Sequence, residues 1–264
     1  MPEIRSHHQA AIDRLVEEYR DDPGYLGLII GGSVAKGYAR DDSDVDFLII
    51  ANDDNYRRRL VDQDLFINRT DLCDYEGGYV DGKIISTDYL VRVAEKGNEP
   101  SRAAFQGAFL GFSHDDALES LLARIPVYPE EGRDERIRAF YSMAFIQNWL
   151  IHEADRHGNR YTELRAASQL ALFAGRLLLA HNRELFPYHK WLPVVLEAVP
   201  EKPDGFMQAF DRLVTEPTAA NAALLFNLLR SFRDWGVSDL EAYTWFMTDV
   251  ENAWMSDATS LEDL

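Results

Sequence analysis

Glycine, serine and aspartate gather at short spacing in residues 31–46 of the chain. In chain order they are Gly31, Gly32, Ser33, Gly37, Ser43, Asp44 and Asp46. Glycines have no Cβ, so backbone N–H groups at the start of this segment can approach an anion and bind a polyphosphate. The two aspartates stand two positions apart, and on a strand both would project from one face and could share metal ions. The segment therefore predicts a site for metal ions and phosphate.

The pattern in residues 31–46 has a simpler alternative. The glycines could supply backbone freedom alone, in a solvated, aspartate-rich turn between two strands. With average residue usage, however, these residue types at fixed offsets would arise by chance roughly once in 10⁸ starting positions. We therefore favour the functional interpretation.

Two apolar runs flank this segment and would position it. Residues 25–30 and 45–50 are apolar on both faces, which is typical of strands that are covered on both sides. They predict neighbouring central strands, with residues 31–46 between them. Further elements are predicted, in chain order, at residues 4–19 (helix), 79–87 (strand) and 88–96 (helix ending at Gly97).

The second half of the chain has helical patterns only. Apolar residues recur at helical spacing over 137–145 and 164–178. Ser238 and Glu241 have the spacing of a capping box, which predicts the start of the last helix. The polar tail, residues 256–264, is expected to fray.

This change of pattern predicts the domain organisation. We expect an α/β domain over residues 1–128. An all-α helical bundle is expected over residues 129–264.

Composition and charge limit the partners. The 264 residues include 27 basic and 45 acidic side chains, a net charge of −18, so no large cationic field is available for nonspecific binding to nucleic acid. The N-terminus has no apolar signal segment, and the most apolar later stretch is interrupted by Arg176. The single cysteine, Cys73, cannot form an internal disulfide. We expect a soluble, cytoplasmic protein that binds neither nucleic acid nor membrane, in an oligomeric state that the sequence leaves open.

The segment 31–46 resembles the signature of the DNA polymerase β-like nucleotidyltransferase superfamily. The matching residues are Gly31, Gly32, Ser33, Gly37, Ser43, Asp44, Val45 and Asp46. The resemblance implies a small mixed sheet flanked by helices, and transfer of a nucleoside monophosphate from an NTP with loss of pyrophosphate. It also implies two Mg²⁺ ions as cofactors. Because a helical domain follows, the whole chain resembles in outline the kanamycin, or aminoglycoside, nucleotidyltransferase group.

The resemblance implies three metal-binding carboxylates. Two are Asp44 and Asp46, and the third comes from an adjacent strand in the superfamily. Asp81 in the predicted strand 79–87 is the best match, although Gly82 stands where an apolar residue is usual. The competing carboxylates are Asp74, Glu76 and Asp88.

The resemblance also implies residues for the other substrate groups. Gly31, Gly32 and Ser33 would bind the NTP phosphates, and Lys190 resembles a lysine that some relatives direct at the triphosphate. Glu153 would be the general base, as the counterpart of a glutamate in the helical domain of kanamycin-type enzymes. The simpler alternative for Lys190 is a surface lysine beside core aromatics. For Glu153 it is a solvated helix carboxylate.

These residues together predict an Mg²⁺-dependent nucleotidyltransferase. The expected acceptor is a hydroxyl group of a small molecule, and the acidic chain would tolerate a cationic one such as an aminoglycoside. The alternative is a non-catalytic or protein-modifying module, similar to antitoxins, that uses the same fold to bind a partner. The close pair Asp44 and Asp46 disfavours a non-catalytic role, because like charges have no use there without a metal ion.

Overall fold

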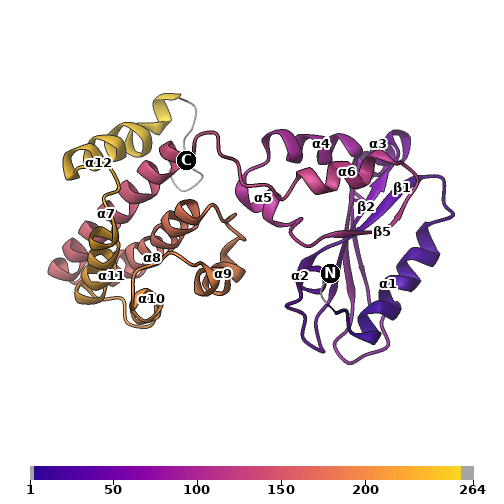
Figure 1. Cartoon of the computed structure of the whole chain (residues 1–264), viewed down its shortest axis with the longest axis horizontal. Helices are drawn as coiled ribbons and strands as arrows, with labels where there is room; N and C mark the ends of the chain where they lie inside the picture. The colour runs from indigo at the N-terminus through magenta and orange to yellow at the C-terminus, as the bar shows by residue number, and fades with distance from the viewer. Residues whose placement is uncertain (1–2, 257–264) are drawn as a thin grey trace. The chain divides into compact units, whose positions relative to one another are not determined.

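The computed structural model describes residues 3–256 of the chain. The chain divides into two compact units, Met1–Tyr128 and Pro129–Leu264 (Figure 1). Within the described residues, the first unit contains a five-stranded sheet with helices, and the second contains helices without strands. The predicted mixed sheet with flanking helices, followed by an all-α region, is confirmed.

The sheet of the first unit is mixed. Its strands are β1 (Tyr25–Ile30), β2 (Val45–Ala51), β3 (Phe66–Arg69), β4 (Val80–Ile85) and β5 (Phe109–Ser113). Their order is β3-β4-β2-β1-β5, with β2 and β4 parallel and the other neighbours antiparallel. The two apolar runs at 25–30 and 45–50 are thus adjacent inner strands, as predicted, and the strand predicted at 79–87 is β4.

Helices cover both faces of this sheet (Figure 1). The helices of the first unit are α1 (Ser6–Tyr19), α2 (Gly32–Lys36), α3 (Asp53–Val61), α4 (Thr87–Lys96), α5 (Glu99–Ala103) and α6 (Ala117–Arg124). Leu28 and Ile30 of β1 pack in one core with Leu15 of α1, whereas Ile29 packs in a second core with Leu90 of α4. Successive side chains of a strand point to opposite faces, so one apolar run contributes to two cores.

The two edge strands were not predicted from the sequence. β3 has four residues, and its Phe66 is 57% exposed. β5 has a register irregularity where it pairs with β1. Short edge strands lack the continuous apolar run that identifies a buried inner strand, so hydrophobic patterns alone do not reveal them.

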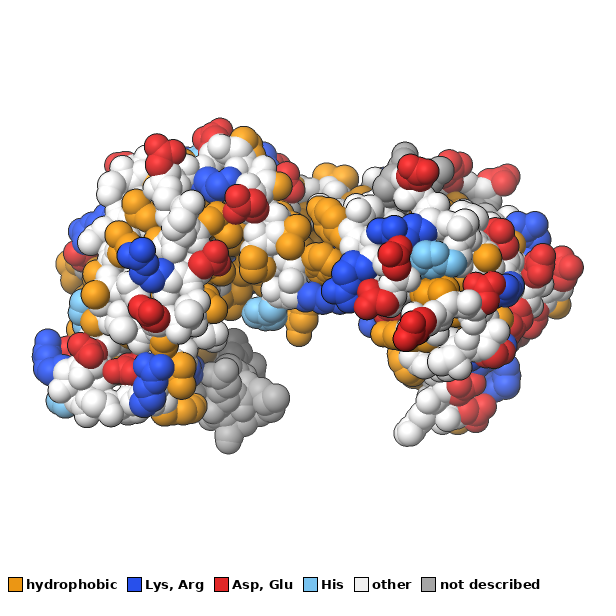
Figure 2. Space-filling model, turned by 90° about the horizontal axis from the view of Figure 1, so that it is seen from below, with side chains coloured by type: hydrophobic (Ala, Val, Ile, Leu, Met, Phe, Trp, Pro, Cys, Tyr) orange, Lys and Arg blue, Asp and Glu red, His pale blue; other side chains and the backbone are white. Residues whose placement is uncertain are grey.

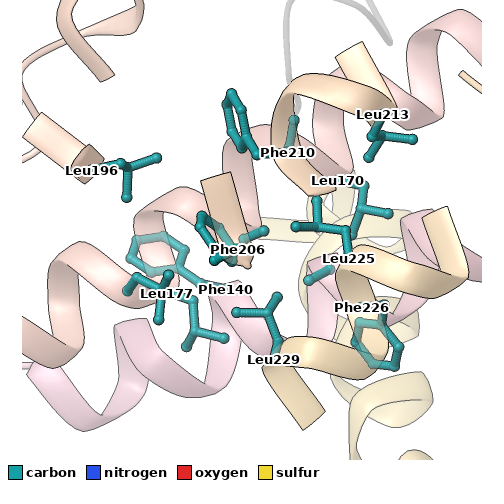
Figure 3. Packing of buried hydrophobic residues seen from close by; sticks show 14 of the residues in the cluster. Phe140, Leu170, Leu177, Leu196, Phe206, Phe210, Leu213, Leu225, Phe226 and Leu229 are labelled. Atoms are coloured by element: carbon teal, nitrogen blue, oxygen red, sulfur yellow. The ribbon is translucent and has the colours of Figure 1, made fainter. Parts of the chain in front are cut away.

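The second unit is a set of packed helices with one core. Its α-helices are α7 (Arg133–His157), α8 (Arg160–Asn182), α9 (Leu192–Ala198), α10 (Phe206–Thr215), α11 (Ala219–Phe232) and α12 (Asp239–Phe246). Phe140, Leu177, Phe206 and Leu229 come from four different helices and meet in this core (Figure 3). Most of the apolar residues that predicted the helical pattern in this half therefore lie in or against the core, whereas Leu164 is 52% exposed.

The start of α12 is as predicted. The Ser238 hydroxyl accepts a hydrogen bond from the Glu241 N–H at 3.3 Å, and the Glu241 carboxylate accepts one from the Ser238 N–H at 2.8 Å. This reciprocal pair is a complete capping box. Of the tail 256–264 that was expected to fray, only Ser256 lies within the described residues.

Two features of the structure bear on its possible partners: the distribution of charge on the surface and the character of the helices. On the face shown in Figure 2, Lys and Arg side chains lie singly or in small groups among Asp and Glu. No helix within residues 3–256 combines the length and the apolar character needed to cross a membrane.

Candidate active site

Three aspartates meet at one end of the sheet. Asp44 directly precedes β2, Asp46 is the second residue of β2, and Asp81 is the second residue of β4. In the parallel pairing of these strands, Asp46 lies opposite Asp81. Ligand oxygens of all three carboxylates lie within 4.8 Å of one another. We call these three residues the aspartate triad.

Gly82 explains how a glycine can follow Asp81 in β4. A Cβ at Gly82 would lie 2.1 Å from Cζ of Phe47, its partner residue in β2. The aromatic ring therefore occupies the space that a side chain at position 82 would need. The glycine that was unexpected beside Asp81 is a packing requirement of the β2–β4 pair.

The competing carboxylates are engaged elsewhere. Asp74 forms an ion pair with an arginine of α1 at 2.8 Å, and Asp88 forms one within α4 at 2.6 Å. Glu76 is exposed, and it belongs to no cluster of potential metal ligands in the described part of the chain. Asp81 is thus the residue of this group that the fold brings to Asp44 and Asp46.

The glycine segment lies directly against the triad. The Gly31 N–H donates to the Asp46 carbonyl at 2.9 Å. Gly32 has φ +60, and a Cβ there would lie 1.7 Å from Oδ2 of Asp46, so the close approach of the backbone requires glycine. Ser33 follows in α2, and its hydroxyl is buried without a hydrogen-bond partner among residues 3–256. A buried hydroxyl without a partner is unfavourable, so this oxygen is available to a ligand.

Burial and like charge make the triad suitable for a cation. Burial, and then the neighbouring Asp44 carboxylate, raises the pKa of Asp81. Oδ1 of Asp81 is buried, and no partner for it exists among the described residues. Closely spaced carboxylates are stable together only when a proton or a cation offsets their charge. Their oxygen atoms are hard ligands of the kind that Mg²⁺ prefers, so the triad could hold divalent metal ions.

Comparison with known proteins agrees with this geometry. Residues 12–97 match the model of a family described as a nucleotidyltransferase domain, and this range contains the whole triad and Gly31–Ser33. Residues 12–97 form a polymerase β-like nucleotidyltransferase domain. The triad is therefore the acidic cluster of such a domain, and a nucleotide is implied as its substrate.

A solved nucleotidyltransferase-like protein from Exiguobacterium sibiricum 255-15 has 14% sequence identity and a TM-score of 0.48, over 93% of this chain and 80% of its own. The comparison with curated proteins found no match.

Two further side chains of the nucleotidyltransferase domain adjoin the triad, and sequence reasoning assigned them no role. Lys36 at the end of α2 is half-buried, and burial lowers the pKa of its ammonium group against the opposing effect of the Asp46 carboxylate. The Tyr79 hydroxyl donates to the Asp44 carboxylate, a hydrogen bond that raises the pKa of the phenol. Lys36 stands three residues after Ser33, and residues at i and i+3 of a helix lie on the same face. This spacing could have indicated that Lys36 lies near the site. Tyr79 has no such signal, because its contact depends on the β2–β4 pairing.

The two predicted residues outside this domain belong to the second unit. Glu153 of α7 has a side chain that is 27% exposed and pairs with Arg156 at 3.1 Å. Lys190 is exposed, and its Nζ lies 5.3 Å from the centroid of the Trp191 ring. Their predicted roles in catalysis and NTP binding therefore stay predictions.

Proposed function

We propose that the chain transfers a nucleoside monophosphate from an NTP to a hydroxyl group of a small molecule and releases pyrophosphate. The observation that carries this proposal is the aspartate triad beside Gly32 and Ser33, within a nucleotidyltransferase domain. A metal site next to an open phosphate-binding turn is the arrangement that nucleotidyl transfer needs, because the substrate itself is a metal-bound polyphosphate.

In this proposal the chain's own residues bind and orient the triphosphate. Asp44, Asp46 and Asp81 would hold two Mg²⁺ ions, which when bound neutralise phosphate charge and activate the attacking oxygen. The unpartnered Ser33 hydroxyl donates to a phosphate oxygen, and the Lys36 ammonium adds positive charge near Asp46. The acceptor oxygen bonds to the α-phosphorus as the bond from that phosphorus to the bridging oxygen breaks, and pyrophosphate leaves with that oxygen.

The acceptor proton needs a base, and we propose Glu153 for this role. A glutamate that exchanges its Arg156 partner for an acceptor hydroxyl could take the proton. Glu163 is a matched control, because it also lies on a helix of the second unit and pairs with an arginine three residues away, at 2.9 Å. Glu153→Gln is expected to lower the transfer rate with little change in NTP binding, whereas Glu163→Gln should retain the rate.

Lys190 is proposed to contact the triphosphate. The Lys190 ammonium group is exposed, so it can contact a phosphate without leaving a buried position. Lys190→Met is therefore expected to raise the KM for NTP more than it lowers kcat. Lys202, whose ammonium donates to the carbonyls of Glu197 and Val199, supplies the control variant Lys202→Met.

The acceptor class rests on charge and on the resemblance to the aminoglycoside group. A chain with a net charge of −18 favours a cationic small molecule over a polynucleotide. The acceptor is therefore proposed to be a hydroxyl-bearing cation, such as an aminoglycoside.

A labelled-nucleotide assay tests the function. The purified chain is incubated with Mg²⁺, each of the four labelled NTPs and a panel of hydroxyl acceptors, and pyrophosphate release and labelled product are measured. We expect release with at least one NTP, and its loss in Asp46→Asn. Release without any labelled small molecule, together with labelled protein, would instead indicate a protein-modifying enzyme. Absence of release with every NTP and acceptor would favour the binding module.

A further inference from the structure

The carbonyl group of Ser43, the residue directly before Asp44, is held from two sides. Nε2 of His8 lies 3.1 Å from this carbonyl oxygen, and the Tyr75 hydroxyl donates to it at 2.7 Å. A carbonyl oxygen has two lone pairs, so the two hydrogen bonds satisfy it completely. This oxygen therefore has a fixed position between α1, which carries His8, and the β3–β4 loop, which carries Tyr75.

The packing around these two donors is close. His8 is fully buried, and its ring meets the Tyr75 ring edge-on with centroids 5.2 Å apart. The neighbouring His7 ring lies 4.5 Å from the Tyr75 ring. A Cβ at Gly78 would lie 2.7 Å from the same tyrosine ring, so the loop reaches this arrangement because position 78 has no side chain. Three aromatic rings and a glycine thus fix the tyrosine hydroxyl in place.

The hydrogen bond defines the state of His8. A carbonyl oxygen only accepts, so Nε2 of His8 must carry the proton, and Nδ1 is then an acceptor. Nδ1 is buried, and none of the described residues supplies it with a partner. His8 therefore makes one side-chain hydrogen bond in the described structure, and that bond is to the backbone next to the triad.

The other side of Asp44 is held as well. The Val45 N–H donates to the Tyr79 carbonyl at 3.1 Å, and the Tyr79 hydroxyl donates to the Asp44 carboxylate. The backbone is thus tied down at the residue before Asp44 and at the residue after it. Asp44 needs this support more than the other two aspartates do, because Asp46 and Asp81 lie within paired strands and Asp44 precedes β2.

We propose that His8 and Tyr75 are positioning residues, which hold the Ser43 carbonyl and thereby orient the Asp44 carboxylate for metal binding. This inference rests on the proposed function, because it assigns to Asp44 a metal ion. Residues behind the ligands of a metal site commonly set its affinity, since they spare the ligands the cost of becoming ordered when the metal binds.

Binding of Mn²⁺ to the metal-free full chain tests the proposal without any turnover. The free Mn²⁺ signal in electron paramagnetic resonance gives Kd for the wild type, Tyr75→Phe, His8→Leu and His8→Gln. Tyr75→Phe keeps the ring contacts and removes the hydroxyl, which donates to the Ser43 carbonyl and also contacts the Cys73 thiol, and we expect Kd to rise by about 10-fold. His8→Leu should have a similar effect, and His8→Gln should restore Kd to within about twofold of the wild type, because its amide can donate to the carbonyl.

Tyr25→Phe is the matched control. It also removes a tyrosine hydroxyl that is bonded in the same unit, to Arg59 at 2.6 Å, but at the opposite end of β1. It should lower the melting temperature without changing the Kd for Mn²⁺. In activity assays, the same Tyr75→Phe variant should need more Mg²⁺ for half-maximal rate and approach wild-type kcat at saturation.

The outcomes separate the two proposals. If the wild type binds Mn²⁺ and Tyr75→Phe binds it equally well while losing thermal stability, the two residues have a structural role only and this inference is wrong. If Kd changes as expected, the inference holds, including in the case that His8→Leu does not fold. If the wild type binds no Mn²⁺, both the inference and the proposed metal-dependent function are wrong.

Discussion

The two ends of the inner strands β1 and β2 use polar residues in opposite ways. At the end where β2 begins, the aspartate triad gathers like charges, and buried oxygens of Ser33 and Asp81 have no partners within the described residues. At the other end, where β2 finishes, polar side chains are linked to one another. Both ends belong to the same strands of the same unit. The difference in hydrogen bonding therefore depends on which residues lie at each end.

The far end is a closed hydrogen-bond network. The Asn52 side chain caps α3 by accepting from the Asn55 N–H at 2.9 Å, and it donates to the Pro23 carbonyl at 3.1 Å. The Asn55 amide donates to the Gly24 carbonyl at 3.2 Å. A hollow of about 400 Å³ lies here, but the network shows that its polar side chains already serve the fold.

The polar groups at these two ends of the strands differ in whether they have hydrogen-bond partners. Buried polar groups in native proteins are almost always hydrogen-bonded, so those left without partners need a separate explanation. At the far end, Asn52 and Asn55 have protein partners, whereas at the triad end Ser33 Oγ and Asp81 Oδ1 have none among the described residues.

The largest expected effect comes from removing a carboxylate charge at the triad. Asp44→Asn or Asp46→Asn should lower the rate of pyrophosphate release by about 10³-fold or more, because the loss of a metal ligand removes several kcal/mol of transition-state stabilisation. Initial rates at saturating NTP and Mg²⁺ measure this loss. Asn55→Ala at the far end should stay within about threefold of the wild type. An equal loss of rate in Asn55→Ala and in the aspartate variants would contradict the distinction between a functional and a structural end.

A glycine substitution at each end should give the next largest difference. Gly32→Ala would place a Cβ 1.7 Å from the Asp46 carboxylate at φ +60, whereas Gly24→Ala meets Asn55 and Asp22 side-chain atoms at 3.0 Å. A displacement of this size at a reacting group can cost about 10²-fold in rate, so Gly32→Ala should lose activity to that extent. Gly24→Ala should cost stability with little loss of rate. Rates and urea unfolding curves of both variants make the comparison.

The far-end network should matter for stability. Asn55→Ala removes the bond to the Gly24 carbonyl and leaves that carbonyl without this partner. We expect the free energy of unfolding to fall by about 1–2 kcal/mol, with the Kd for Mn²⁺ unchanged. Urea denaturation and Mn²⁺ titration of one sample measure both. A weakened metal site in this variant would mean that the two ends are coupled.

The smallest expected effect concerns His8 and acid. Burial, and then the neighbouring His7, lowers the pKa of His8, so the unfolded chain takes up its proton at higher pH than the folded chain does. The unfolded state then binds more protons, and stability falls as pH falls from about 7 to 5. His8→Gln should reduce this slope in pH-dependent melting curves. Melting curves of the wild type and His8→Gln, recorded at the same series of pH values, make the comparison.

Local patterns predicted the parts of the fold that depend on neighbouring residues. The inner strands β1 and β2, the end of α4 at Gly97 and the capping box at Ser238 each follow from residues within a few positions of one another. The edge strands were missed, because a strand such as β3 owes its existence to pairing with β4 and not to its own composition.

The sequence by itself determined where the candidate metal and phosphate site lies in the chain. The tertiary structure decided which further residues join that site. Gly32, Asp44 and Asp46 lie within one short segment, so their spacing alone predicted a phosphate and metal site. The choice of Asp81 over Asp74, Glu76 and Asp88 depended on strand register, since Asp81, opposite Asp46 in β4, is the one of these four whose carboxylate lies with Asp44 and Asp46 in the described structure. The hold of His8 and Tyr75 on the Ser43 carbonyl spans more than thirty positions in either direction. Such contacts follow from packing between elements, which local spacing does not encode.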